Sequence, residues 1–146
     1  MWGMRRLVIA MLLSVAAAFP PAVALAVDRT GGPGADRLEG TSGNDRLNGR
    51  GGNDVLIGRG GRDLLAGDAG RDRLAGGPGA DTLLGGGGAD HIGAGGGRDV
   101  VAAGVGNDTV NVRGGGADRV SCGPGFDVVS ADGSDSIGSD CERVRR

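Results

Sequence analysis

The hydrophobic and polar positions of this chain repeat every nine residues from Gly31 onward. In each unit a large aliphatic residue holds the eighth place, an aspartate the sixth and a glycine the fourth. This period belongs to neither a single helix nor a flat strand, whose side chains repeat about every 3.6 and 2 residues. It therefore indicates a supersecondary unit that is copied along the chain.

Each unit divides into a turn and a short strand. The first six places are rich in glycine, which tolerates positive φ, and in Asn and Asp, which hydrogen-bond locally, so they predict a turn. The last three places, such as Val55-Leu56-Ile57, predict a strand whose middle side chain points inward. Strands this short are stable only when stacked, about 4.8 Å apart. The expected apolar spine consists of Leu38, Leu47, Leu56, Leu65, Leu74, Leu83, Ile92, Val101, Val110, Val120 and Val129.

The frame extends over eleven units. Nine run without a break to Asn111, one residue is inserted near Val112, and two more units end at residue 130. A shortened, degraded unit and the tail SDCERVRR fill residues 131–146, where we expect a C-terminal cap. The sixth-place residues are Asp36, Asp45, Asp54, Asp63, Asp72, Asp81, Asp90, Asp99, Asp108, Asp118 and Asp127.

These positions match the pattern GGxGxDxUx, in which U is a large aliphatic residue. Over residues 31–130 the chain resembles the hemolysin-type, or RTX, calcium-binding repeat. The resemblance implies an all-β fold, a right-handed parallel β-roll (a solenoid) with two nonapeptides per coil. It also implies calcium ions between the turns of units n and n+2. Both aspartates would ligate each ion, together with turn carbonyls.

Two units per coil would stack the aspartates in two columns, one through Asp36 and Asp54 and the other through Asp45 and Asp63. Neighbouring carboxylates about 4.8 Å apart repel by roughly 3.5 kcal/mol at an effective dielectric of 20. A hard cation between them reverses the sign of this interaction, and Ca²⁺ prefers six to eight oxygen ligands in tolerant geometry. The alternative is that aspartate serves only as a good turn residue.

The first place of each unit bears on where such ions would bind. Units eight to eleven begin with Ala94, Ala103, Arg113 and Cys122 instead of glycine, so we expect weaker or missing sites there. The first-place carbonyls expected to assist the eleven aspartates are those of Gly31, Gly40, Gly49, Gly58, Gly67, Gly76 and Gly85.

Composition narrows the class of protein. The chain has 34 glycines among 146 residues without the three-residue period of collagen. From residue 27 onward, 14 arginines stand against 18 acidic residues, and no basic patch with aromatic platforms is evident, so nucleic acid is not expected as a partner. One histidine and two cysteines do not favour zinc. No nucleophile is paired with a base, so we do not expect an enzyme.

Residues 1–26 have the three regions of a secretory signal peptide. Arg5 and Arg6 precede a short apolar run, and Ala24-Leu25-Ala26 fits a signal-peptidase site. A transmembrane anchor is the alternative, but the run is short and is interrupted by two prolines. We therefore expect a secreted, extracellular chain with no membrane span after cleavage, which begins with a short lead-in at residues 27–30.

The two cysteines are Cys122 and Cys141. Their separation of 19 residues is close to the 18 of one coil, so adjacent-coil stacking is plausible, and exported cysteines usually pair. We expect a disulfide, with a pair of reactive thiols as the alternative.

The function expected from these features is calcium binding by a secreted β-roll that folds when it binds the ion. The alternative is an extracellular adhesion or matrix module for which Ca²⁺ is only structural. Calcium ions are the expected partners, and a cell-surface or matrix partner is left open.

Overall fold

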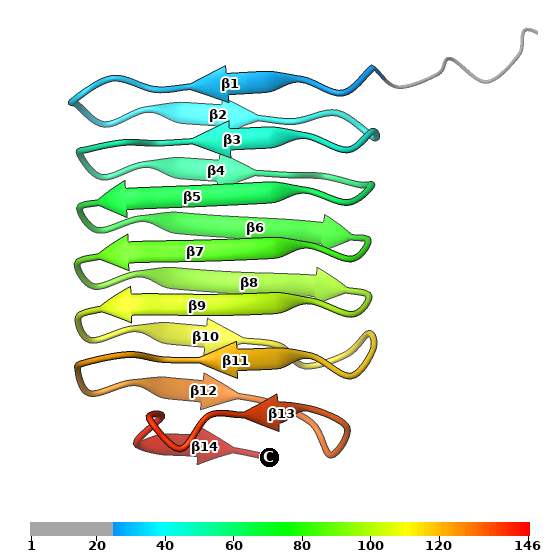
Figure 1. Cartoon of the computed structure of the whole chain (residues 1–146), viewed down its shortest axis with the longest axis vertical. Coiled ribbons are helices and arrows are strands. Elements are labelled where there is room, and N and C mark those ends of the chain that lie inside the picture. The colour runs from blue at the N-terminus through cyan, green and yellow to red at the C-terminus, as the bar shows by residue number, and fades with distance from the viewer. Residues whose placement is uncertain (1–24) are drawn as a thin grey trace, which may run out of the picture.

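The computed structural model describes residues 25–146, so the expected signal peptide lies almost entirely outside the described residues. Residues 25–146 form 14 strands and no helix (Figure 1). No helix among them could span a membrane. The strands are β1 (Asp28–Thr30), β2 (Arg37–Glu39), β3 (Arg46–Asn48), β4 (Val55–Ile57), β5 (Leu64–Ala69), β6 (Arg73–Pro78), β7 (Thr82–Gly87), β8 (His91–Gly96), β9 (Val100–Val105), β10 (Thr109–Asn111), β11 (Arg119–Ser121), β12 (Val128–Ser130), β13 (Ser136–Ile137) and β14 (Arg143–Arg145).

The strands alternate between two parallel sheets. The odd sheet has the order β1-β3-β5-β7-β9-β11-β13, and the even sheet has the order β14-β12-β10-β8-β6-β4-β2. Over most of the stack each residue pairs with the residue 18 places later, as Leu47 does with Leu65. In Figure 1 the odd strands run leftward in front and the even strands rightward behind as the stack descends, which is a right-handed coil. The predicted parallel β-roll with two units per coil is therefore confirmed.

The core is the predicted spine together with a second inward column. Every spine residue after Leu38 is buried, and Leu38, near the open end of the stack, is partly buried. The second column occupies the first place of the later units and was not predicted. Its apolar members, each at most 1% exposed, are Ala94, Ala103, Val112, Cys122 and Ala131.

The structure corrects the reading of the frame at residue 112. The sequence placed Arg113 at the start of unit ten, but Val112 holds this inward place, and Arg113 is exposed. The N–H of Val112 donates to the carbonyl of Ser130 at 2.9 Å, the bond made by other first-place residues to the next coil. The extra residue therefore lies in the turn before Asp118, where the longer loop leaves the spine in register.

The predicted strand length of three residues is wrong for β5 to β9, which have six residues each. Their strands continue into the first three places of the next unit because the neighbouring coil supplies hydrogen bonds there. The N–H of Ala69 donates to the carbonyl of Arg50 at 2.8 Å, and Asp68 pairs in register with Gly86. The middle of the stack is therefore held together along most of each half-coil.

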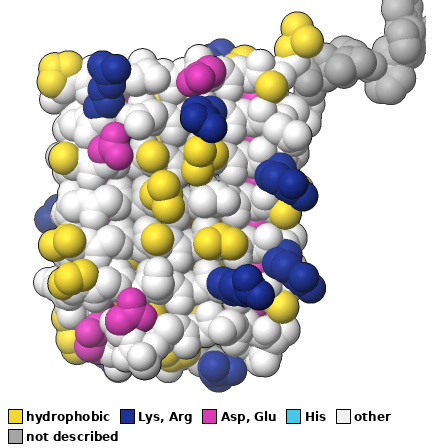
Figure 2. Space-filling view, in the orientation of Figure 1, with side chains coloured by type: hydrophobic (Ala, Val, Ile, Leu, Met, Phe, Trp, Pro, Cys, Tyr) yellow, Lys and Arg dark blue, Asp and Glu magenta, His cyan; other side chains and the backbone are white. Residues whose placement is uncertain are grey.

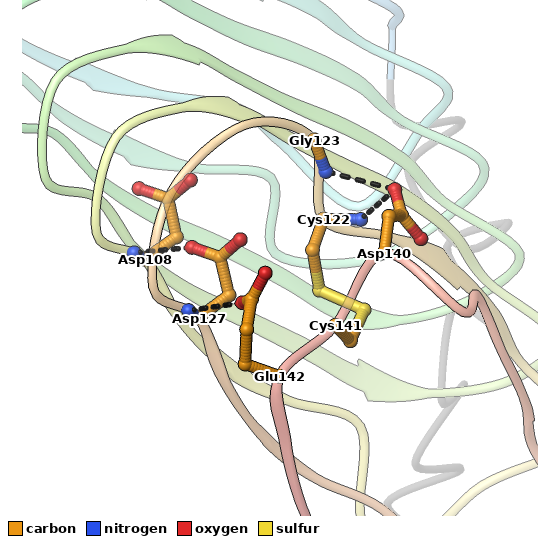
Figure 3. Close-up of a disulfide and its surroundings, with 7 residues drawn as sticks. All are labelled: Asp108, Cys122, Gly123, Asp127, Asp140, Cys141 and Glu142. Atoms are coloured by element: carbon orange, nitrogen blue, oxygen red, sulfur yellow. Dashed lines mark hydrogen bonds between the residues drawn. A yellow bond between two sulfur atoms is a disulfide. The ribbon is translucent and has the colours of Figure 1, made fainter.

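Both ends of the described chain continue the coil. The lead-in at residues 27–30 contains β1, which pairs with β3 in register. At the other end, β13 and β14 close the two sheets, and a disulfide joins Cys122 to Cys141 with their Cα atoms 5.2 Å apart. The carboxylate of Asp140 accepts hydrogen bonds from the N–H groups of Cys122 and Gly123 at 2.9 and 2.8 Å (Figure 3).

Removing this disulfide should lower the free energy of unfolding by about 3 kcal/mol, because it closes a loop of about 20 residues in the unfolded chain. Urea unfolding of the oxidised protein in Ca²⁺ should be compared with that of a Cys122→Ala/Cys141→Ala variant, since alanine already occupies the first place at Ala94 and Ala103. Reductant should destabilise the parent and leave the variant unchanged. Equal unfolding midpoints for parent and variant would contradict a role for the bond in stability.

Candidate metal centre

The aspartates form two continuous columns inside the coil, as expected for two units per coil. In each column Oδ1 of one aspartate accepts a hydrogen bond from the backbone N–H of the aspartate one coil earlier. The N–H of Asp36 donates to Asp54 and that of Asp63 to Asp81, at 2.7 and 2.8 Å. One column contains Asp36, Asp54, Asp72, Asp90, Asp108 and Asp127, and the other Asp45, Asp63, Asp81, Asp99, Asp118 and Asp135.

The second oxygen of most column carboxylates is buried and has no hydrogen-bond partner among residues 25–146. The side chains of Asp72, Asp90 and Asp99 are 0% exposed. Burial of a carboxylate oxygen without compensation is costly, so each of these atoms requires a donor or a cation. The Oδ2 atoms that find no hydrogen-bond partner within the described part of the chain belong to Asp54, Asp63, Asp72, Asp81, Asp90, Asp99, Asp108, Asp118 and Asp127.

The first two units satisfy this oxygen in another way. The N–H of Gly32 donates to Oδ2 of Asp36 at 2.6 Å, and the N–H of Thr41 donates to Oδ2 of Asp45. From the third unit to the ninth, the same second place has positive φ, even where the residue is not glycine: Arg50 (75°), Arg59 (82°) and Asp68 (70°). This conformation destabilises the folded state by about 1–2 kcal/mol for each of these three non-glycine residues. Strain of this kind at a repeated place accompanies the unpartnered carboxylate oxygens.

Burial raises the pKa of the column carboxyls. Desolvation is the main cause at Asp81 and Asp90, where the pKa reaches about 6; the bonded N–H opposes the rise, and neighbouring column carboxylates add to it. The pKa values rise for the same leading reason at Asp63, Asp72, Asp99, Asp108, Asp118 and Asp127. The folded coil therefore disfavours the charged columns unless a positive charge balances them.

The first-place glycines bring a carbonyl oxygen next to the Oδ2 atom of the column carboxylate. A Cβ at Gly31 would lie 2.6 Å from Oδ2 of Asp36 and 2.7 Å from the carbonyl oxygen of Gly49 in the next coil. The same two kinds of oxygen, from the sixth place and from the first place one coil later, lie closer than 3.0 Å to the Cβ position at Gly40, Gly49, Gly58, Gly67, Gly76 and Gly85. Each such space is bordered by the oxygen donors that a hard cation prefers.

The donor set consists of stacked carboxylates and carbonyls. In residues 25–146 no three side chains of His, Cys, Asp or Glu converge in one place. The remaining oxygens around an ion would therefore come from the backbone, which suits Ca²⁺. From Ala94 onward the first-place residue has a Cβ in the inward column, where the earlier units have glycine; the weaker sites expected there stay a prediction.

Two further carboxylates continue the columns and were not among the predicted residues. The N–H of Asp118 donates to Asp135 at 3.1 Å, and the N–H of Asp127 donates to Oε2 of Glu142 at 2.8 Å (Figure 3). Both carboxylates stand two places before an aliphatic residue, Ile137 and Val144, as every sixth-place aspartate does. This local spacing could have identified them where the count of nine fails.

Comparison with known proteins gives the family. The model described as RTX calcium-binding nonapeptide repeat (4 copies) matches residues 30–65, 57–92, 66–101, 75–110 and 93–129. The chain belongs to the RTX calcium-binding repeat family. No curated protein and no solved structure was found to match it. The RTX repeats support a Ca²⁺-binding β-roll, which is a structural calcium-binding repeat and not a known catalytic family.

The two aspartate columns predict that pH has opposite effects on folding with and without calcium. A carboxyl whose pKa is raised by folding stabilises the folded state fully at pH values below its ordinary pKa of about 4. This stabilisation is lost as the pH rises through the folded-state pKa, which is about 6 at Asp81 and Asp90. Calcium-free protein should therefore have more β-structure near pH 4.5 than at pH 7.5. In Ca²⁺ the order should reverse, because protons compete with the ion.

Circular dichroism between pH 4 and 7.5, on protein passed over a chelating resin and then with Ca²⁺ restored, measures both effects. A calcium-free protein whose β-content rises steadily with pH would contradict the burial of charged columns.

Proposed function

We propose that this chain is a secreted calcium-binding protein whose RTX units bind Ca²⁺ between stacked turns and fold on binding it. One observation carries the proposal: at successive levels of both columns, buried Oδ2 atoms with no hydrogen-bond partner in the described part of the chain lie beside backbone carbonyl oxygens. Carboxylate oxygens with backbone carbonyls beside them, and no fixed octahedral arrangement, favour Ca²⁺ over Mg²⁺, which keeps its waters and demands octahedral geometry.

The best sites lie in units three to seven. There the first place is glycine, Oδ2 has no partner within the described residues, and the second place has positive φ. In units one and two the N–H groups of Gly32 and Thr41 already donate to Oδ2. We therefore assign at least five strong sites, with Asp54, Asp63, Asp72, Asp81 and Asp90 as their central carboxylates. The other ligands proposed for each ion are the sixth-place aspartate one coil later and the backbone carbonyl of the first place one coil later.

Folding and ion binding are coupled in this proposal because the charged columns repel one another in the calcium-free coil. Ca²⁺ reverses this repulsion, so the chain would stay unfolded at low calcium concentration and fold where calcium is abundant. The signal-like residues 1–26 and the disulfide, which forms in oxidising compartments, support an extracellular location.

Binding fits the columns better than catalysis does. An acid–base pair needs two groups with different environments, whereas Asp72, Asp81 and Asp90 have equivalent hydrogen bonds and the same direction of pKa shift. An adhesion or matrix role with structural Ca²⁺ stays the alternative, and it would use the outer surface and not the columns.

Calorimetric titration of the whole exported chain with Ca²⁺ tests the proposal. Gly67→Ala should bind about one ion fewer and need more Ca²⁺ to fold, because its Cβ would meet Oδ2 of Asp72 and the carbonyl of Gly85 closer than 3.0 Å. Gly93→Ala is the matched control, since its Cβ would meet only the carbonyl oxygen of Leu74, at 4.0 Å.

No heat of Ca²⁺ binding by the parent protein would refute calcium binding itself. Unchanged stoichiometry and affinity in Gly67→Ala would refute the assigned position of the site.

A further inference from the structure

The coil separates its charges between inside and outside. All 14 arginines in residues 25–146 are exposed, whereas 11 of the 18 acidic side chains are buried, all of them in the two columns. The outer surface of the folded coil is therefore cationic, although the sequence pI is about 5.3. Column carboxylates balanced by bound cations, or by protons, cannot neutralise that surface, so an anionic partner is expected on physical grounds.

Four of these arginines lie along one flank of the odd sheet. In register across this sheet lie Arg46, Leu64, Thr82, Val100 and Arg119, so that two arginines stand on either side of three uncharged residues. Strand β5 also carries the exposed Asp68 at its far end. Arg62 and Arg98 stand in the turns two residues before Leu64 and Val100. Figure 2 shows basic side chains along the right side of this face, beside hydrophobic ones in the middle. We call Arg46, Arg62, Arg98 and Arg119 the arginine flank.

The arginine flank is available for a partner. The only ion pairs among residues 25–146 join Arg37 and Arg59 to Glu39, outside the flank. Two surface hollows lie along it: one of about 450 Å³ is lined in part by Arg46 and Arg62, and one of about 310 Å³ in part by Arg98 and Arg119. The exposed Asp28 also lines the first hollow, and the carboxylates of Asp45, Asp63 and Asp118 that border the hollows belong to the buried columns.

Aliphatic side chains adjoin the arginine flank on the same sheet. Leu84 and Val100 are 38% and 45% exposed, and Leu64, Ala66 and Ala102 are partly exposed beside them. Strands β3, β5, β7, β9 and β11 contribute no aromatic side chain to this face, so it lacks the stacking platforms of single-stranded nucleic-acid sites. Arginine beside exposed aliphatics on a flat, rigid face is instead suited to the interface of a bilayer.

We propose that the arginine flank and the adjoining aliphatic side chains bind the surface of an anionic phospholipid bilayer. Guanidinium groups hydrogen-bond phosphate in a bidentate fashion, and four of them on one rigid face can reach headgroups at the same time. The aliphatic side chains would then contact the upper acyl region. This binding requires the folded coil, and hence Ca²⁺ if the proposed function holds, but it uses no metal ligand.

Vesicle co-sedimentation of the whole exported chain in Ca²⁺ tests this proposal. Vesicles of phosphatidylglycerol and phosphatidylcholine should retain the protein, vesicles of phosphatidylcholine alone should not, and high salt should release it. Replacing all four flank arginines by glutamine should weaken binding several hundred-fold, at roughly five-fold per arginine. The matched control replaces Arg71, Arg73, Arg143 and Arg145, which lie in or beside the even sheet, and should bind within a few-fold of the parent.

A Leu84→Asn/Val100→Asn variant separates lipid from other polyanions, since it should lose vesicle binding while keeping all four arginines. Any one of four results would overturn the proposal. The protein could bind both kinds of vesicle equally, or the flank and control variants could lose binding equally. The Asn changes could have no effect, or the protein could bind soluble dextran sulfate more tightly than vesicles. Circular dichroism and calcium titration of the same samples keep the two proposals distinguishable: a folded, calcium-loaded protein that ignores anionic vesicles refutes only the lipid surface.

Discussion

The stacking of like-charged carboxylates inside a narrow coil is the constraint on which the rest of this structure depends. From Asp54 onward, each column aspartate accepts the N–H of the aspartate one coil earlier, which fixes the register of successive coils. The same arrangement buries its second oxygen, raises the pKa of the carboxyl and sets it next to its neighbours in the column. The arrangement that organises the stack therefore also destabilises it while the carboxylates are charged and no cation balances them.

The glycine pattern follows from this constraint. The first place must lack a Cβ wherever a carboxylate and a carbonyl oxygen share its inward side, as at Gly58 and Gly76. Where alanine, valine or cysteine takes that place, apolar packing supports the stack instead, and the disulfide at Cys122 ties the last coils together. Between Gly85 and Ala94 the first place thus changes from a glycine beside two oxygen atoms to an apolar side chain packed in the core.

Much of this could be predicted from the sequence, because a fixed period transmits one local geometry to every unit. The spine follows from the places of glycine, aspartate and leucine, whereas the parallel coil and its two aspartate columns follow from the resemblance to the RTX repeat that those places carry. The role of Val112 could not, since a count of nine cannot tell a longer turn from a shifted spine; the hydrogen bond to Ser130 decides it. The six-residue strands and the strain at Arg50 and Arg59 also depend on contacts between coils, which no single unit encodes.

The central claim is that a cation makes the charged columns compatible with the folded coil. Amide hydrogen exchange at pH 7.5, followed in Ca²⁺ and in calcium-free protein, measures it directly at the N–H groups of the column aspartates. These amides should be strongly protected in Ca²⁺, and from Asp54 to Asp90 they should exchange freely without it, since their acceptors belong to the next charged carboxylate. Equal protection in both samples would contradict the account.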